Sequence, residues 1–214
     1  MNNGTIVKQV NFKSMELIYL QTMLKAFANI SAEDYALSKD FWSIKTYKKG
    51  SFFNNYRGIC KTAGFIMDGA FRAYHIDEKT EAEKNVFLYS KDQIVVAYKS
   101  FIDQVPCNYY TQALTDATII SISYDKLIKL YTLSHGWERF GRLMAEYASK
   151  IAVERMESFL FQTPEERYLN MMNNHPEILN TVQLYHISSY LGIQGPSLSR
   201  IRKRLCHVND FNRG

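Results

Sequence analysis

Basic side chains gather near the end of the chain. Residues 182–214 include one acidic residue, Asp210, and five basic residues, which are Arg200, Arg202, Lys203, Arg204 and Arg213. Lys and Arg bind the phosphates of a DNA duplex largely by releasing its counterions. The imbalance therefore predicts a surface that binds DNA. A solvated basic helix end is the plainer alternative.

Two short helices are predicted to position these side chains. Apolar residues recur at helical spacing before and after Gly192; they are Leu184, Ile187, Leu191, Leu198, Ile201 and Leu205. Two helices that meet at a turn with glycine form a helix-turn-helix, because Gly adopts a positive φ without a Cβ clash. Polar residues off the apolar stripe form the predicted DNA-binding set: Gln194, Ser197, Arg200, Lys203 and Arg204. A helical hairpin without a DNA function shows the same pattern.

The composition is that of a globular protein. The chain has 214 residues, 46% hydrophobic and 22% charged, with a net charge of +5, which allows one large or two small domains and mildly favours an anionic partner. The three cysteines, Cys60, Cys107 and Cys206, are far apart, so neither a disulfide framework nor a four-thiolate iron–sulfur cluster is expected. Without a long apolar run or a signal-peptide pattern, we expect a cytoplasmic protein with no membrane association.

Residues 42–123 are predicted to be rich in β-strands. Their apolar residues alternate with polar ones, and turn residues are frequent. Asp68-Gly69 and Thr115-Asp116 each lie between β-prone runs and predict two hairpins, at residues 65–74 and 109–123. Several short strands at this spacing imply a sandwich or a rolled barrel.

Helices are expected on both sides of this region. Residues 15–30 and 31–39 precede it, the second with Ser31 as its N-cap. After a short helix at 125–131, a long helical pattern follows Ser134 and ends near Phe161. A heptad-like apolar seam on this long helix predicts a dimer interface; its residues are Phe140, Met144, Tyr147 and Ile151. Packing of the same seam on the β-rich region is the alternative.

A domain boundary is predicted near Gln162. Thr163 and Glu166 form a capping-box pattern with Pro164 at the first helical position. The expected organisation is a sensor domain at residues 1–132, a dimerisation helix at 133–162 and a DNA-binding domain at 163–214.

These parts, in this order, resemble the Crp/Fnr family of bacterial transcription regulators. The motifs that carry the resemblance are Lys48-Lys49-Gly50, Asp68-Gly69-Ala70-Phe71-Arg72, Pro164-Glu165-Glu166-Arg167-Tyr168-Leu169, Ile187-Ser188-Ser189-Tyr190-Leu191-Gly192-Ile193 and Leu198-Ser199-Arg200-Ile201-Arg202. The resemblance implies an α+β fold with an N-terminal antiparallel β-roll of the cyclic-nucleotide-binding jelly-roll type, a long dimerisation helix and a C-terminal winged helix-turn-helix.

The resemblance also implies how such a protein acts. It implies a homodimer on an inverted-repeat operator in double-stranded DNA, with RNA polymerase as a further partner. Arg200 would read a guanine through its O6 and N7 atoms. Gly195-Pro196 stands where family members commonly carry base-reading side chains. Base reading should therefore depend mainly on Arg200 and on DNA shape.

The effector is not identified by the sequence. A cyclic-nucleotide site of this family needs a Gly-Glu pair and an Arg before Ser or Thr, and residues 92–109 contain neither. Binding of cAMP is therefore not expected, nor is haem on a single residue such as His75. The corresponding pocket would be lined by Val96, Ala97, Tyr98, Lys99, Asn108 and Tyr109.

Two other classes of function stay open. One is a metalloenzyme in a cupin-like β-barrel, which needs converging ligands such as His and Glu. The five histidines are dispersed, so we expect no metal site and no enzyme. The other is a ligand-binding module that has lost DNA binding.

Overall fold

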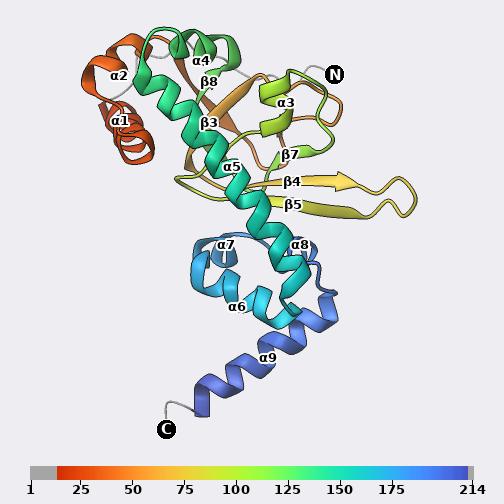
Figure 1. Ribbon diagram of the computed structural model, residues 1–214. Helices are drawn as coiled ribbons and strands as arrows, with labels where there is room; N and C mark the ends of the chain where they lie inside the picture. The colour runs from red at the N-terminus through yellow and green to blue at the C-terminus, as the bar shows by residue number, and fades with distance from the viewer. Residues whose placement is uncertain (1–13, 212–214) are drawn as a thin grey trace.

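The computed structural model describes residues 14–211 as an N-terminal β-roll joined by a long helix to a group of C-terminal helices (Figure 1). The strands are β1 (Trp42–Tyr47), β2 (Phe52–Asn54), β3 (Thr62–Asp68), β4 (Phe71–Ile76), β5 (Glu83–Tyr89), β6 (Ile94–Val95), β7 (Tyr110–Ala113) and β8 (Ala117–Ser123). The helices are α1 (Ser14–Ala28), α2 (Ala32–Ser38), α3 (Tyr98–Asp103), α4 (Tyr124–Tyr131), α5 (His135–Phe161), α6 (Pro164–Asn174), α7 (Pro176–Thr181), α8 (Leu184–Leu191) and α9 (Gly195–Phe211).

The strands form two four-stranded antiparallel sheets, in the orders β1-β8-β3-β6 and β2-β7-β4-β5. Both predicted hairpins are wrong, because β3 and β4 belong to different sheets, as do β7 and β8. The Asp68-Gly69 turn instead takes the chain from one sheet to the other. Gly69 has a φ of +90°, and a Cβ there would lie 2.5 Å from the Cβ of Ala117 at the start of β8. Among the described strands, β4 and β5 follow each other in the chain and do pair as an antiparallel hairpin.

Local capping signals set the starts of several helices. The Ser31 hydroxyl accepts a hydrogen bond from the Asp34 backbone N–H at 3.0 Å and begins α2. Thr163 and Glu166 form the complete capping box at the start of α6, with Pro164 as its first residue. The predicted long helix is α5, which ends at Phe161 as expected. The capping predictions at Ser31 and Thr163 are therefore confirmed.

One core joins α1 and the first half of α5 to the β1-β8-β3-β6 sheet. Phe140 and Met144 are buried in it, and Phe27 of α1 lies edge-on to Phe140 at 5.3 Å and to Tyr147 at 6.2 Å. The predicted dimer seam thus packs largely against its own chain, because α1 and the sheet already cover it. Phe140 and Met144 are not accessible to a partner.

A different apolar face of α5 is exposed. Val153, Met156 and Leu160 are 47%, 55% and 66% exposed. At 100° per residue, these three residues lie on the side of the helix opposite to the predicted seam of Phe140, Met144, Tyr147 and Ile151. This exposed face is confined to the half of α5 nearest the C-terminal helices (Figure 1).

A second core unites the C-terminal helices with the β-roll. It contains Ile187, Leu191, Leu198 and Ile201, together with apolar residues of α6 and α7 and with Ala70 and Leu88 of the β-roll. The helix α7 was not predicted; Pro176 is its first residue and Ile178 its buried one. In the described part of the chain no strand follows β8, so the wing implied by the resemblance is not formed there. None of the described helices is both long enough and apolar enough to span a membrane.

Candidate nucleic-acid interface

The predicted helix-turn-helix is formed by α8 and α9. Gly192 ends α8 with a φ of +64°. Its N–H bonds to the Ser189 carbonyl at 3.2 Å, and the Ile193 N–H bonds to the Ser188 carbonyl at 2.9 Å. These two bonds satisfy carbonyls at the end of α8 and fix the direction in which the chain enters α9.

Two arginines hold the carboxyl end of α8. Arg155 of α5 donates to the Tyr190 carbonyl, and its guanidinium lies over the Tyr190 ring at 3.6 Å. Arg167 of α6 is buried and donates to the carbonyls of Leu191 at 2.8 Å and Gln162 at 2.7 Å. Cations at the end of a helix stabilise its exposed carbonyls and its dipole. The orientation of the motif is therefore fixed from both α5 and α6.

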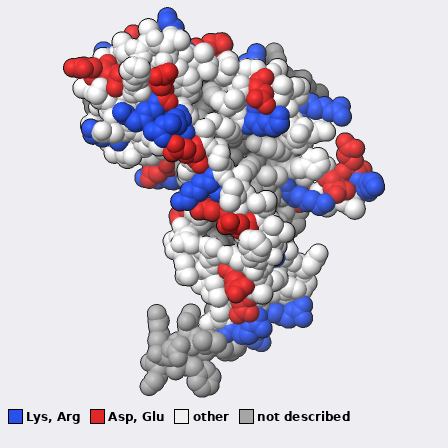
Figure 2. Space-filling model, viewed as in Figure 1, with Lys and Arg blue, Asp and Glu red and all other residues white. Residues whose placement is uncertain are grey.

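The helix α9 has one buried and one exposed face. Leu198 and Ile201 are buried against the other C-terminal helices. Residues 182–205 contain four basic and no acidic side chains; the basic residues, all exposed, are Arg200, Arg202, Lys203 and Arg204. Figure 2 shows positive side chains gathered over α9 at the lower end of the molecule. This arrangement presents positive charge on a helix that projects from the body of the protein (Figure 1).

The structure refines the roles of the predicted site residues. Arg200 donates to the Ser197 hydroxyl at 3.2 Å, so these two side chains are brought together. Gln194 lies exposed in the turn, and Lys203 is exposed on α9. Arg204 instead forms an ion pair with Glu165 of α6, which partly offsets its charge. The side chains of Cys206 and Asp210, and all of Arg213, lie outside the described residues.

The helix α8 is docked on the outer edge of the β-roll. The Asn85 backbone N–H donates to the Ser189 hydroxyl at 3.0 Å, and that hydroxyl donates to the Glu83 carbonyl at 3.0 Å. The Asn85 side-chain amide donates to the His186 carbonyl at 2.9 Å. Arg72, which is paired with Glu83, lies 3.2 Å from His186 Nδ1. The predicted DNA-binding motif is therefore in direct contact with the β-roll.

The side chains at the predicted effector site do not converge. Lys99 is exposed and forms an ion pair with Asp103 one turn along α3 at 3.0 Å, so it does not reach into the β-roll. Asn108 is exposed and Ala97 is fully buried. Tyr109 packs edge-on against Phe87 at 6.3 Å, and burial raises the pKa of its phenol well above the usual value. Val96 and Tyr98 are packed against the core.

Arg155 and Arg167 were missed by sequence reasoning. Arg167 lies inside a motif that carried the family resemblance, so that motif could have marked it. Arg155 has no such signal. Among the described residues, no three His, Cys, Asp or Glu side chains gather as they would to bind a metal ion.

No family model and no curated protein matches the chain. Solved structures do match it. FixK2 from Bradyrhizobium japonicum superposes with a TM-score of 0.67 at 15% identity, covering 78% of this chain and 86% of that one. The c-di-GMP-responsive global regulator CLP of Xanthomonas campestris gives 0.62 at 15% identity, covering 84% and 93%. The catabolite activator protein of Thermus thermophilus gives 0.54 at 12%, covering 87% and 88%.

At such low identity the similarity establishes the fold. The chain has the α+β fold of the Crp/Fnr-type regulators, with a cyclic-nucleotide-binding-like β-roll and a C-terminal helical domain. The fold predicted from the sequence is therefore confirmed, apart from the wing and the two hairpins.

Proposed function

We propose that this protein is a sequence-specific DNA-binding transcription regulator. The observation that carries the proposal is the exposed face of α9, which holds Arg200, Arg202 and Lys203 on the second helix of a firmly positioned helix-turn-helix. Ser197 restricts Arg200, and a guanidinium fixed in this way can bond a guanine edge through two atoms. Lys203 is suited to a phosphate contact.

We further propose that the regulator acts as a homodimer. Val153, Met156 and Leu160 form an exposed apolar face on α5, next to the helices that would bind DNA. A two-fold partner on this face would place two copies of α9 on half-sites about one helical turn apart. The expected domain limits (1–132, 133–162 and 163–214), the contact with RNA polymerase and the cytoplasmic location stay predictions.

The sensor domain is proposed to have diverged from cyclic-nucleotide binding. A buried phosphate needs a cation and hydrogen-bond donors beside it. The predicted cation, Lys99, is instead exposed and paired with Asp103. The proposal is that the β-roll keeps its architecture and does not bind cAMP.

Selection from a random duplex library tests the DNA-binding function. The recovered site should be an inverted repeat, and the logarithm of its binding constant should fall linearly with the logarithm of salt concentration. Arg200→Ala should weaken binding by about 1–3 kcal/mol and relax the preference at one base position of each half-site. Arg57→Ala, at an exposed site on the β-roll, is the matched control and should bind as the wild type does.

Two results would contradict this function. Absence of any salt-dependent association with DNA would favour a ligand-binding module. A stoichiometric transition metal in the purified protein, without DNA binding, would favour the cupin-like enzyme.

A further inference from the structure

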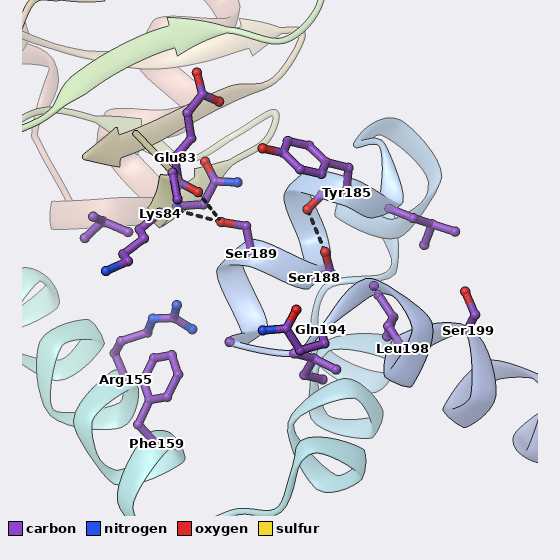
Figure 3. Close-up of a pocket in the computed structure, with 17 residues that line it drawn as sticks. Glu83, Lys84, Arg155, Phe159, Tyr185, Ser188, Ser189, Gln194, Leu198 and Ser199 are labelled. Carbon is purple, nitrogen blue, oxygen red and sulfur yellow. Dashed lines mark hydrogen bonds between the residues drawn. The ribbon is translucent and has the colours of Figure 1, made fainter. Parts of the chain in front are cut away.

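A cavity of about 940 Å³ lies between the β-roll, α5 and the helix-turn-helix. Its walls come from β5, from the last half of α5, and from α8 and the start of α9. Figure 3 shows Arg155 and Phe159 of α5 on one side, with Gln194 and Leu198 on the other. This volume is in the usual range for a site that holds a small molecule.

One wall of the cavity carries a cation without a carboxylate partner. Arg155 is partly buried, and its partners are the Tyr190 carbonyl and the rings of Phe159 and Tyr190. Among the described residues, no Asp or Glu forms an ion pair with it. The other charged residues lining the cavity are already paired, Lys84 with Asp77 and Glu83 with Arg72. Arg155 therefore supplies the unbalanced charge of the site.

The remaining lining is largely apolar. The apolar residues in it are Ala82, Val86, Phe159, Leu184, Ile193 and Leu198. A DNA phosphate would gain nothing from these side chains, whereas the hydrocarbon part of a small molecule would be removed from water.

From these features we infer that the cavity between the β-roll and the helix-turn-helix binds a small organic anion that has an apolar body. Arg155 binds the anionic group, and the apolar side chains remove the body of the molecule from water. The ligand touches β5, α5 and α9 together. This inference does not depend on whether the chain binds DNA.

The probe is 8-anilinonaphthalene-1-sulfonate, which combines a sulfonate, an N–H donor and an aromatic body. N-phenyl-1-naphthylamine is its neutral counterpart. Fluorescence titration of the full chain should give saturable binding, tighter for the sulfonate than for the neutral amine. Inorganic phosphate should compete with the sulfonate but not with the amine.

Two substitutions locate the probe. Arg155→Gln should weaken sulfonate binding about tenfold, as expected for the loss of one charge-assisted hydrogen bond. Arg142→Gln, which makes the same change at an exposed position of α5, is the control. Because Arg155 also holds α8, a second variant is needed: Ser199→Glu places a negative charge at the exposed lining residue Ser199, and Ser199→Gln is its neutral match.

The expected pattern is weaker sulfonate binding in Arg155→Gln and Ser199→Glu, with both controls close to wild type and the amine unaffected throughout. Equal affinity for the two probes in the wild type would overturn the inference. Unchanged sulfonate affinity in Ser199→Glu would also overturn it, since the probe would then lie elsewhere.

Discussion

Gly192 meets two requirements at the turn between α8 and α9. Its φ is +64°, and a Cβ there would lie 2.7 Å from Cε1 of Phe159. The backbone strain should contribute more to the loss of stability than the contact with Phe159. The aromatic side chain can shift, whereas a residue with a Cβ stays strained in the left-handed conformation. Gly192→Ala should lower the free energy of unfolding by about 1–3 kcal/mol.

The measurement for this substitution is thermal or urea unfolding. The matched control is Gly195→Ala, where a Cβ meets nothing within 4 Å and φ is not positive. That variant should be as stable as the wild type or slightly more stable. An equal loss of unfolding free energy in Gly192→Ala and Gly195→Ala would show that the turn does not require glycine at position 192.

The roles of residues that bond to groups close in sequence could be predicted. The roles of residues that bond to backbone groups far away in sequence could not. Ser31, Thr163 and Gly192 bond to groups within four residues, so their types and spacing indicate their roles. Arg155 and Arg167 bond to carbonyls 35 and 24 residues away. A charged residue in a helix is usually solvated, and nothing local indicates such a partner.

At the scale of elements, the capping box at the start of α6 has a measurable effect. Thr163→Ala removes the side-chain acceptor for the Glu166 N–H and should cost about 1 kcal/mol of stability. Thr181→Ala is the control and should cost much less, because the Thr181 hydroxyl bonds back to the Glu177 carbonyl within α7 and caps no backbone N–H. Chemical denaturation compares the two.

The docking of α8 on β5 should depend on pH through His186. Arginine can only donate, so the contact with Arg72 requires an unprotonated Nδ1 on His186. Burial first, and then the positive charge of Arg72, hold the pKa of His186 below its usual 6.5; Lys49 acts in the same direction and Glu83 opposes it. The pKa of His186 is therefore lower in the folded protein than in the unfolded chain. The contact with Arg72 stabilises the fold above pH 6.5, and this stabilisation is lost as the pH falls through the pKa of His186 in the folded protein.

Unfolding midpoints between pH 5 and 8 test this dependence. The wild type should lose stability towards pH 5, and His186→Gln should lose less of it. His135→Gln, at a fully exposed side chain of α5, should retain the wild-type profile. An identical slope in the wild type and His186→Gln would contradict the role of His186.

The sequence indicated where strands lie along the chain but not which strands pair with each other. Turn residues and alternation indicate where a strand begins and ends. They do not indicate which strand it pairs with, and here the Asp68-Gly69 and Thr115-Asp116 turns each connect the two sheets. Pairing is decided by contacts far apart in sequence, such as β3 with β8. Phe140 and Met144 of the predicted helix seam are buried for the same reason, because they pack in a core with α1 and the sheet.

At the scale of the whole molecule, the proposed dimer depends on the exposed face of α5. Leu160→Glu places a charge on that face and should shift the protein from dimer to monomer in light scattering after gel filtration. Ile18→Glu, at a 61% exposed residue of α1, is the matched control and should leave the assembly unchanged. A dimer that persists in Leu160→Glu would mean that the copies meet elsewhere.

The hydroxyl of Ser189 has a consequence for solubility. β5 is the last strand of its sheet, and the Glu83 carbonyl and Asn85 N–H are groups that a further strand would otherwise pair with. Ser189 bonds to both of them, so α8 closes an edge at which another polypeptide could add a strand. Any movement that lifts the C-terminal helices from the β-roll therefore also exposes the edge of β5 to aggregation. The protein should aggregate less if such a movement is brief, or if a partner covers the edge while it is exposed.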